Sequence, residues 1–343
     1  MHMPRNTMIR RLFLGITVVL AGCSAQPQPK DCGRAPVFCV GLVTDFGGVD
    51  TGINHEAWLA LQDALAAGMA QRVDVIETVD VRDRAANIAA FADQGYDVVV
   101  TIGSSMADAT AAAASKYPKS AFIGVEQPQD KLLPNLVSLA FHEEQSGFLA
   151  GALAALFSQT DRVAAICDAK FVDAMRRYCD GFVAGARYAR PDINATATYR
   201  DGPNNRLFND PEWGHAAALA EVQSGADVVF AAGGNTARAA LETAAAQGTY
   251  AIGTETDLYG ELANVRPMLL TSAVNETRVG VLDLLRKTHD GAFPPGEYMG
   301  EVGLAPWHDL DSQIPEAVKQ ELDKIRVRLA AGMISIDVPY KAP

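Results

Sequence analysis

The chain has 343 residues, of which 49% are hydrophobic and 7% are aromatic, and its formal net charge is −12. This length exceeds what one hydrophobic core usually organises, which favours two domains. The acidic balance argues against binding to nucleic-acid phosphates or anionic lipid headgroups, so we expect no nucleic-acid partner.

The first 22 residues are typical of an export signal. Three arginines precede a short apolar run over residues 12–20, which is too short to span a bilayer. The sequence Leu-Ala-Gly-Cys at residues 20–23 then resembles a bacterial lipobox, where cleavage leaves an acylated cysteine at the new N-terminus. We therefore predict a signal peptide over residues 1–22 and a lipidated tether over residues 23–36, with Cys23 as the lipidation site. An ordinary signal peptide, with Cys23 incidental, is the alternative.

The remaining chain is expected to be an exported body on a lipid tether. Residues 1–22 carry three arginines and no acidic residue, so their removal takes the formal charge to −15. No later segment has the length and hydrophobicity of a transmembrane helix, so the lipid anchor is the only membrane attachment that we expect.

Four cysteines remain in this exported body, where disulfides can form. The pairs closest in sequence are Cys32–Cys39 and Cys167–Cys179, but four cysteines allow three connectivities. Neither spacing is a zinc pattern, and we expect no metal and no cofactor.

Residues 37–141 alternate short apolar strands with helices. Strands are predicted over residues 37–43, 73–78, 98–102, 121–125 and 136–140. A helix is predicted over residues 54–67, where Trp58, Leu61 and Leu65 recur at spacings of three and four. Two further helices are predicted over residues 83–93 and 106–117. Fully apolar short strands that alternate with helices indicate a parallel sheet covered on both faces.

The pattern restarts at residue 142. Helices are predicted over residues 145–157, 172–188, 211–223 and 236–247, and strands over residues 163–167, 195–199, 228–232 and 250–253. A final group has a strand at 268–274, a helix at 277–288, a strand near 298–304 and a helix at 315–331.

Two successive doubly wound parallel sheets predict an α/β protein with the two lobes of the type I periplasmic-binding-protein fold. We assign residues 37–141 and 266–293 to lobe I, and residues 142–265 and 294–343 to lobe II. We expect the protein to be a monomer.

The residues that follow the predicted strands are the first candidates for a ligand site. In open parallel sheets, ligands sit beyond the carboxyl ends of the strands. The residues at these positions are Asp45, Ser104, Glu126, Asp168, Gly234 and Glu255. Burying a carboxylate without a partner is costly, so a purely structural role is unfavourable for Glu126 and Glu255.

A series of short segments carries a more specific pattern. They are Val-Gly-Leu-Val-Thr-Asp-Phe-Gly-Gly-Val-Asp at residues 40–50, Asn-His-Glu-Ala-Trp at 54–58, Ile-Gly-Ser at 102–104, Lys-Tyr-Pro at 116–118, Pro-Asn-Leu-Val-Ser at 134–138, Glu-Glu-Gln-Ser-Gly-Phe-Leu-Ala-Gly at 143–151, Gly-Phe-Val-Ala-Gly at 181–185, Phe-Asn-Asp-Pro at 208–211 and Ala-Ile-Gly at 251–253. Their order and spacing resemble the basic membrane protein family, which includes purine-nucleoside receptors of ABC importers. The resemblance implies a two-lobed receptor that captures a nucleoside for import.

The resemblance also implies ligand-binding residues. Asp45 matches the aspartate that contacts the ligand after the first strand. Ile53 and Asn54 match a Phe-Asn pair that opens the first helix, after a one-residue gap. Phe208 matches a second aromatic that stacks on the base. The structural alternatives are a turn-capping role for Asp45, a helix N-cap at Asn54 and a core position for Phe208.

Several of the matched positions depart from the family pattern. Glu126 and Glu255 match two ribose-binding aspartates, but each is longer by one methylene. Asn275 matches a lysine, so a positive charge between two carboxylates is missing. Ile53 offers an apolar contact in place of aromatic stacking, which is worth ~1–3 kcal/mol per base. These departures make the pocket more acidic and less suited to an anion, so we expect a neutral or cationic polyhydroxylated ligand.

Together these patterns predict a substrate-binding lipoprotein of an ABC importer, anchored to the cell membrane and facing the periplasm or the exterior. Its ligand is expected to be a purine nucleoside or a similar small polyhydroxylated molecule, bound between the lobes and passed to a permease. The alternatives are a receptor for a signalling partner and a nucleoside-hydrolysing enzyme. An enzyme would need a nucleophile or a metal, and no Gly-x-Ser-x-Gly motif is present. Adjacent ATPase and permease genes would favour import over signalling.

Overall fold

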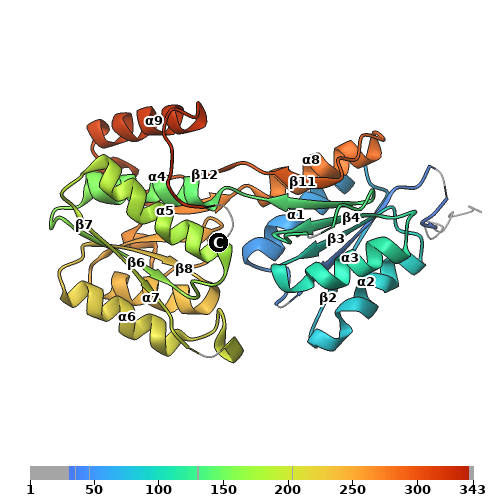
Figure 1. The fold of residues 1–343 in the computed structure, drawn as a ribbon, viewed down its shortest axis with the longest axis horizontal. Coiled ribbons are helices and arrows are strands. Elements are labelled where there is room, and N and C mark those ends of the chain that lie inside the picture. Colours follow the sequence, from blue (N-terminus) through green and yellow to red (C-terminus); the bar gives the residue numbers. More distant parts are fainter. Residues whose placement is uncertain (1–30, 35, 46, 130, 203, 340–343) are drawn as a thin grey trace, which may run out of the picture.

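The computed structural model describes residues 31–34, 36–45, 47–129, 131–202 and 204–339, and it places them in two lobes side by side (Figure 1). Cys23, the whole expected signal peptide and the first part of the expected tether lie outside these residues. Within the described ranges, no helix has the length and apolar character needed to cross a membrane.

Lobe I is built on a parallel sheet with the strand order β11-β5-β4-β3-β1-β2. Its strands are β1 (Cys39–Thr44), β2 (Arg72–Glu77), β3 (Val98–Ile102), β4 (Ala121–Val125), β5 (Leu136–Ala140) and β11 (Gly296–Met299). One face packs against α1 (Gly52–Ala66) and α8 (Thr277–His289), and the other against α2 (Arg84–Asp93) and α3 (Ala107–Lys116). Because both faces are covered, the central strand β3 is buried along its whole length.

Lobe II repeats this plan with the strand order β12-β10-β9-β8-β6-β7. Its strands are β6 (Arg162–Cys167), β7 (Asn194–Tyr199), β8 (Val228–Ala232), β9 (Tyr250–Glu255), β10 (Leu269–Asn275) and β12 (Val302–Leu304). All pair in parallel except β12, which runs antiparallel to β10 at the edge. Helices α4 (Glu143–Phe157), α5 (Asp173–Ala189) and α9 (Glu316–Ala330) pack on one face, and α6 (Pro211–Gln223) and α7 (Gly234–Ala246) on the other.

Short 3-10 turns complete the two lobes. They are η1 (Val81–Asp83), η2 (Ser104–Met106), η3 (Asn204–Arg206), η4 (Arg266–Met268) and η5 (His308–Gln313). The chain passes between the lobes after β5, after β10 and between β11 and β12. The predicted two-lobed α/β fold is therefore confirmed, and these crossing segments join the lobes.

Two of the expected lobe boundaries are wrong. Residues 266–293 were assigned to lobe I, but β10 pairs with β9 in the sheet of lobe II. Residues 294–343 were assigned to lobe II, but β11 pairs with β5 in lobe I. The single strand expected near 298–304 is in fact β11 and β12, at the edges of different sheets. The local pattern does not determine which sheet a short edge strand joins, because that depends on tertiary pairing.

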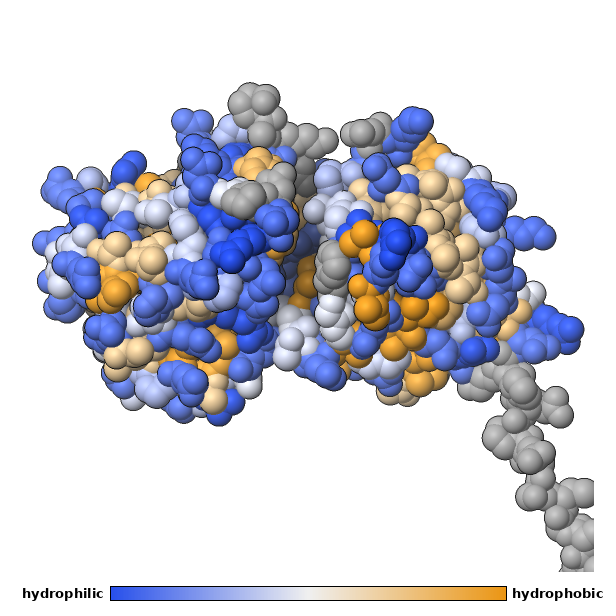
Figure 2. All heavy atoms as spheres, turned by 90° about the horizontal axis from the view of Figure 1, so that it is seen from below, coloured by the Kyte–Doolittle hydropathy of each residue, from blue (hydrophilic) through white to orange (hydrophobic). Residues whose placement is uncertain are grey.

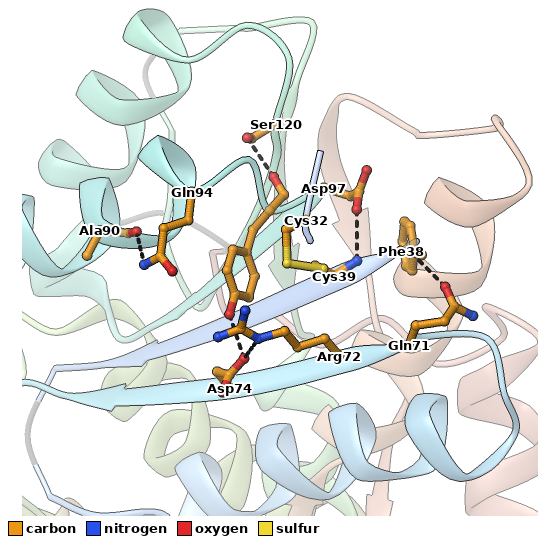
Figure 3. Close-up of a disulfide and its surroundings, with 11 residues drawn as sticks. Cys32, Phe38, Cys39, Gln71, Arg72, Asp74, Ala90, Gln94, Asp97 and Ser120 are labelled. Carbon is orange, nitrogen blue, oxygen red and sulfur yellow. Dashed lines mark hydrogen bonds and ion pairs between the residues drawn. A yellow bond between two sulfur atoms is a disulfide. The ribbon is translucent and has the colours of Figure 1, made fainter. Parts of the chain in front are cut away.

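Two disulfides brace the lobes, and both join the pairs closest in sequence. Cys32–Cys39 ties the entry of the chain to β1, with a Cα–Cα distance of 5.7 Å, and Cys167–Cys179 ties the end of β6 to α5, at 6.5 Å. Figure 3 shows the first of them at the start of β1, where Asp97 Oδ2 accepts the backbone N–H of Cys39 at 2.8 Å. The second fixes α5, a helix that carries part of the site described below.

Helices α4 and α5 pack backbone against backbone. A Cβ atom on Gly151 would overlap the carbonyl oxygen of Phe182, and one on Gly185 would overlap that of Phe148. Any larger side chain at these glycines would push the helices apart. This close approach brings Arg177 of α5 against the N-terminal turn of α4.

Candidate ligand site

A cavity of about 240 Å³ lies between the lobes. The surface is hollowed between the two lobes in Figure 2. Lobe I lines the cavity with the loop after β1 and the start of α1, and lobe II lines it with the ends of β8 and β9, the start of α7 and the loop that follows β9. Of the predicted site residues, those that line it are Ile53, Asn54, Gly234 and Glu255.

The other predicted site residues are Asp45, Glu126, Phe208 and Asn275, and they are not part of this lining. Three of them are next to residues that do line it, as shown below for Phe208, Glu126 and Asn275. Asp45 lies within lobe I. A direct ligand contact by any of the four stays a prediction.

Three predicted site residues have a backbone conformation that non-glycine residues rarely adopt. The φ angle is 55° at Glu126, 60° at Phe208 and 71° at Glu255. This left-handed conformation is costly for a residue with a Cβ atom, and such positions cluster at functional sites where the surrounding structure holds them in place. Glu126 follows β4 and Glu255 ends β9. The unusual backbone conformation therefore occurs at the carboxyl ends of strands, where ligand-binding residues were predicted.

The start of α1 forms the lobe I wall of the cavity. Asn54 Nδ2 donates to the carbonyl oxygens of Gly48 and Gly47, at 3.3 Å and 3.5 Å. The N-cap residue of α1 is Thr51, so the N-cap alternative for Asn54 is wrong. Asn54 lies in the first turn, where it fastens the glycine loop after β1, and Ile53 presents an aliphatic side chain beside it.

Asp45 is engaged within lobe I. Arg84 Nε donates to its Oδ1 atom at 2.6 Å, and the hydroxyl of Ser105 donates to its Oδ2 atom. These contacts tie the end of β1 to α2 and to the turn after β3, which is a structural role.

Phe208 is held in position by Asp168, a fully buried carboxylate directly after β6. Its backbone N–H donates to Asp168 Oδ2 at 3.1 Å, and Thr236 donates to the same oxygen at 2.6 Å. Arg200 donates to Asp168 Oδ1 at 3.1 Å. Gly234 lies so close to Phe208 that a Cβ on Gly234 would overlap its carbonyl oxygen. Phe208 is half-buried and packs partly on the core of lobe II, so the core alternative holds for part of its surface.

Glu126 directly follows β4 and Glu255 ends β9, and because the charge of Glu126 acts on Glu255 we call these two carboxylates the acidic pair. Val274 of β10 pairs with Glu255 in the sheet, and the next residue is Asn275. Asn275 Nδ2, at the end of β10, donates to Glu126 Oε1 at 2.9 Å and so joins a lobe II strand to a lobe I strand. Burial raises the pKa of Glu126. Burial and the nearby charge of Glu126 raise the pKa of Glu255 to about 7. The pair therefore occupies a region that disfavours two negative charges.

Arg177 is the nearby cation on α5. Its Nε atom donates to Glu143 Oε2 at 2.7 Å and lies 3.6 Å from Glu144 Oε2. Burial raises the pKa of Glu143 to about 8, although Arg177 opposes this shift. Tyr178 is fully buried beside these groups, and burial and three neighbouring glutamates raise the pKa of its hydroxyl.

A carboxylate of lobe II also reaches lobe I, and we call Glu261 with Gly52 and Arg238 the Glu261 bridge. The backbone N–H of Gly52 donates to Glu261 Oε1 at 2.9 Å, and Arg238 of α7 donates to Oε2. Helix α1 has no side-chain cap and no acidic residue in its first turn. Glu261 therefore supplies, from the opposite lobe, the negative charge that the positive end of this helix favours.

Sequence reasoning missed Arg238 and Glu261, although both line the cavity. Arg238 follows Gly234 by four residues in α7, so helical spacing from a predicted residue was a signal that pointed to it. Glu261 lies in the loop after β9, where no sequence pattern marks it.

Residues 39–304 match the family described as ABC transporter substrate-binding protein PnrA-like (Bmp). The chain is 28% identical to the ABC transporter nucleoside-binding protein BmpA of Lactococcus lactis subsp. cremoris (strain MG1363), over 97% of this chain and 98% of that protein. It is 26% identical to Basic membrane protein D of Borreliella burgdorferi (strain JD1), over 95% and 93%.

Solved structures share the fold. A solute-binding protein of an ABC transporter system from Aeropyrum pernix K1 has a TM-score of 0.72 and 18% identity, over 88% of this chain and 94% of that chain. One from Conexibacter woesei DSM 14684 has a TM-score of 0.72 and 20% identity, over 89% and 100%. At such identities the similarity establishes the two-lobed architecture alone.

Proposed function

Because the chain belongs to the PnrA-like family of ABC transporter substrate-binding proteins, we propose that it is a lipid-anchored receptor that captures a nucleoside-like molecule and delivers it to an ABC permease. The observation that carries the proposal is the cavity between the lobes, to which Ile53 and Asn54 of lobe I and Gly234 and Glu255 of lobe II contribute. A relative of nearly equal length is named as nucleoside-binding, which supports the choice of ligand class.

Capture by this receptor is a closing of the lobes on the ligand. A ligand that touches both lobes stabilises the closed arrangement, which is the shape that the permease reads. The Glu261 bridge favours closure, because the backbone N–H of Gly52 and the carboxylate of Glu261 come from opposite lobes and meet at 2.9 Å. The three segments that cross between the lobes act as the hinge.

The cavity offers complementary chemistry for a nucleoside-like ligand. Ile53 presents an apolar side chain from lobe I, and Phe208 packs behind Gly234 in lobe II. The carboxylate of Glu255 accepts hydrogen bonds, which suits the hydroxyls of a sugar. An apolar wall with a few placed polar groups is the usual composition of a small-molecule site.

Anchoring through Cys23 completes the proposal. Cys32 follows Cys23 by nine residues and is disulfide-bonded to Cys39 at the start of β1, so the tether would be short and would hold lobe I near the membrane. Disulfides persist outside the reducing cytoplasm, which agrees with an exported receptor. Replacing Cys23 with serine should release the protein from the membrane fraction, and radiolabelled palmitate should no longer be incorporated.

A thermal-shift screen with nucleosides, bases and sugars tests ligand capture. A ligand at a hundredfold excess over its Kd should stabilise the protein by about 2.7 kcal/mol and raise its unfolding temperature by a few degrees. Replacing Glu255 with alanine should abolish the shift, whereas the same change at Glu242, an exposed residue of α7, should keep it. If none of the compounds raises the unfolding temperature, the proposed ligand class is contradicted.

A further inference from the structure

Some of the described glutamates around the cavity form ion pairs with arginines, and others do not. The nearby guanidinium groups each have another carboxylate as their ion-pair partner, since Arg177 pairs with Glu143 and Arg238 pairs with Glu261. Across the ranges that the structure describes, the acidic pair has no ion-pair partner: neither Glu126 nor Glu255 lies within 4.0 Å of a basic side chain. Glu255 faces the cavity.

A further hydrogen-bond acceptor lies beside the acidic pair. Asn275 is 4% exposed, and its Nδ2 atom is used by Glu126. Its Oδ1 atom is buried and meets no hydrogen-bond donor among the described residues. A buried carbonyl oxygen without a donor is unfavourable, so a partner from outside the chain is expected. The arrangement therefore presents two carboxylates and an amide oxygen, and among the described residues no donor meets that amide oxygen.

Two kinds of ligand group could donate to Asn275 Oδ1 beside the acidic pair, and they differ in charge. A sugar hydroxyl supplies one donated hydrogen bond and no charge, whereas an ammonium group supplies three donors and a positive charge. A charge-assisted hydrogen bond in a desolvated place is stronger than a neutral one. No cluster of histidine, cysteine and acidic side chains in the described part of the chain is arranged to hold a metal ion, so an organic cation fits better than a metal.

We propose that the ligand of this receptor carries a protonated amine, which is held between Glu126 and Glu255 and donates to Asn275 Oδ1. This inference rests on the proposed function, because it requires the inter-lobe cavity to be the ligand site. It narrows the ligand class from neutral nucleoside-like molecules to those with a cationic amine on the part that reaches the acidic pair.

Isothermal titration with matched probes at pH 7 tests the inference. The neutral probe is adenosine, and the cationic probes are 3′-amino-3′-deoxyadenosine, 5′-amino-5′-deoxyadenosine and the plain diamine putrescine. The native protein should bind at least one amino nucleoside roughly tenfold more tightly than adenosine. Glu126→Gln and Glu255→Gln should each reduce this preference to less than about twofold, because each removes half of the acidic pair. Glu242→Gln, the same change at an exposed residue of α7, should leave the preference intact.

A variant that introduces a positive charge at the proposed amine position gives a second test of the inference. In Asn275→Lys, an ammonium group of the protein would sit beside Glu126, where the ligand amine is proposed to bind. Affinity for the amino nucleosides should then fall more than affinity for adenosine. The unfolding temperature of each variant without ligand shows whether it is folded.

The outcomes separate this inference from the proposed function. If adenosine binds and the amino nucleosides bind no more tightly, the inference is overturned and the proposed function stands. If putrescine binds and no nucleoside does, the inference stands and the nucleoside class is wrong. If neither kind of probe binds, both are overturned.

Discussion

Glu255 and Glu261 line the same cavity and lie six residues apart, but their carboxylates have different interaction partners. Glu261 receives an arginine from its own lobe and a backbone N–H from the other lobe. Glu255 forms no ion pair with a basic side chain of the described residues, and burial together with the charge of Glu126 raises its pKa to about 7.

This difference separates two roles that a carboxylate in a binding cavity can have. A carboxylate whose partners come from the protein holds the lobes together. Replacing such a carboxylate lowers the stability of the protein even without ligand. A carboxylate that lacks such partners is unfavourable in the empty protein and becomes favourable only when a ligand supplies the donor. The following predictions are arranged from the largest expected effect to the smallest.

Removing the Cys167–Cys179 disulfide should have the largest effect on stability. This bond fixes α5, whose Arg177 binds Glu143 close to the acidic pair. The double serine variant should lose about 3 kcal/mol of unfolding free energy, as expected for a closed loop of this length. Urea unfolding measures the loss, and ligand affinity should fall with it.

The other disulfide provides the control. The double serine variant of Cys32 and Cys39 should lose a similar amount of unfolding free energy, because loop-closure entropy depends only weakly on loop length and the sequence separations are 7 and 12. Its ligand affinity should be unchanged, since this bond lies at the start of β1. Equal losses of affinity in both variants would show that α5 has no special part in the site.

Glu255→Gln should make the protein more stable at high pH. The folded-state pKa of Glu255 is raised from an ordinary value of 4.5 to about 7, so its contribution to stability is present below pH 4.5 and is lost as the pH rises through 7. The charged groups that act on it are Glu126, Glu261 and Arg238. At pH 8 the variant should gain roughly 2 kcal/mol over the native protein, which is less than the full pKa change implies because Glu255 is partly exposed to solvent, and at pH 4.5 the two should be equal. Denaturant unfolding at both pH values measures this, and equal stability at pH 8 would mean that Glu255 is well solvated.

Glu261→Ala should have the opposite sign and a smaller size. It removes the partner of Arg238 and the cap of α1, so the closed arrangement should lose about 1 kcal/mol. Ligand dissociation, followed by stopped-flow fluorescence, should accelerate roughly fivefold. A dissociation rate equal to that of the native protein would show that the bridge does not favour closure. Glu261→Gln should show a milder effect, because its side-chain oxygen still accepts from Gly52.

The sequence was sufficient for the parts of this molecule that depend on local pattern. The apolar run at 98–102 is a buried central strand, and Glu126 and Glu255 follow or end apolar strands, where parallel sheets place ligand groups. The segment near 298–304 was predicted as one strand because two short strands separated by two residues look like one until their sheet partners are known.

The contacts between the lobes could not be predicted from the sequence, because they depend on how the two lobes pack. Glu261 and Gly52 are 209 residues apart, and only the packing of the two lobes brings a loop carboxylate to the start of α1. The hydrogen bond from Asn275 to Glu126 likewise depends on which sheet β10 joins. The sequence pattern placed this strand in lobe I, but it pairs with β9 in lobe II. Asp45 was judged from its position after a strand, which does not reveal the arginine of α2 that pairs with it.

The central claim is that a small molecule is gripped between the lobes by residues from both. The most direct test is a crystal structure of the protein with a compound that stabilises it in the thermal-shift screen. We predict density for the compound in contact with Ile53 or Asn54 on one side and with Glu255 on the other, with the Glu261 bridge intact. A compound bound to one lobe alone, with the acidic pair untouched, would contradict this account.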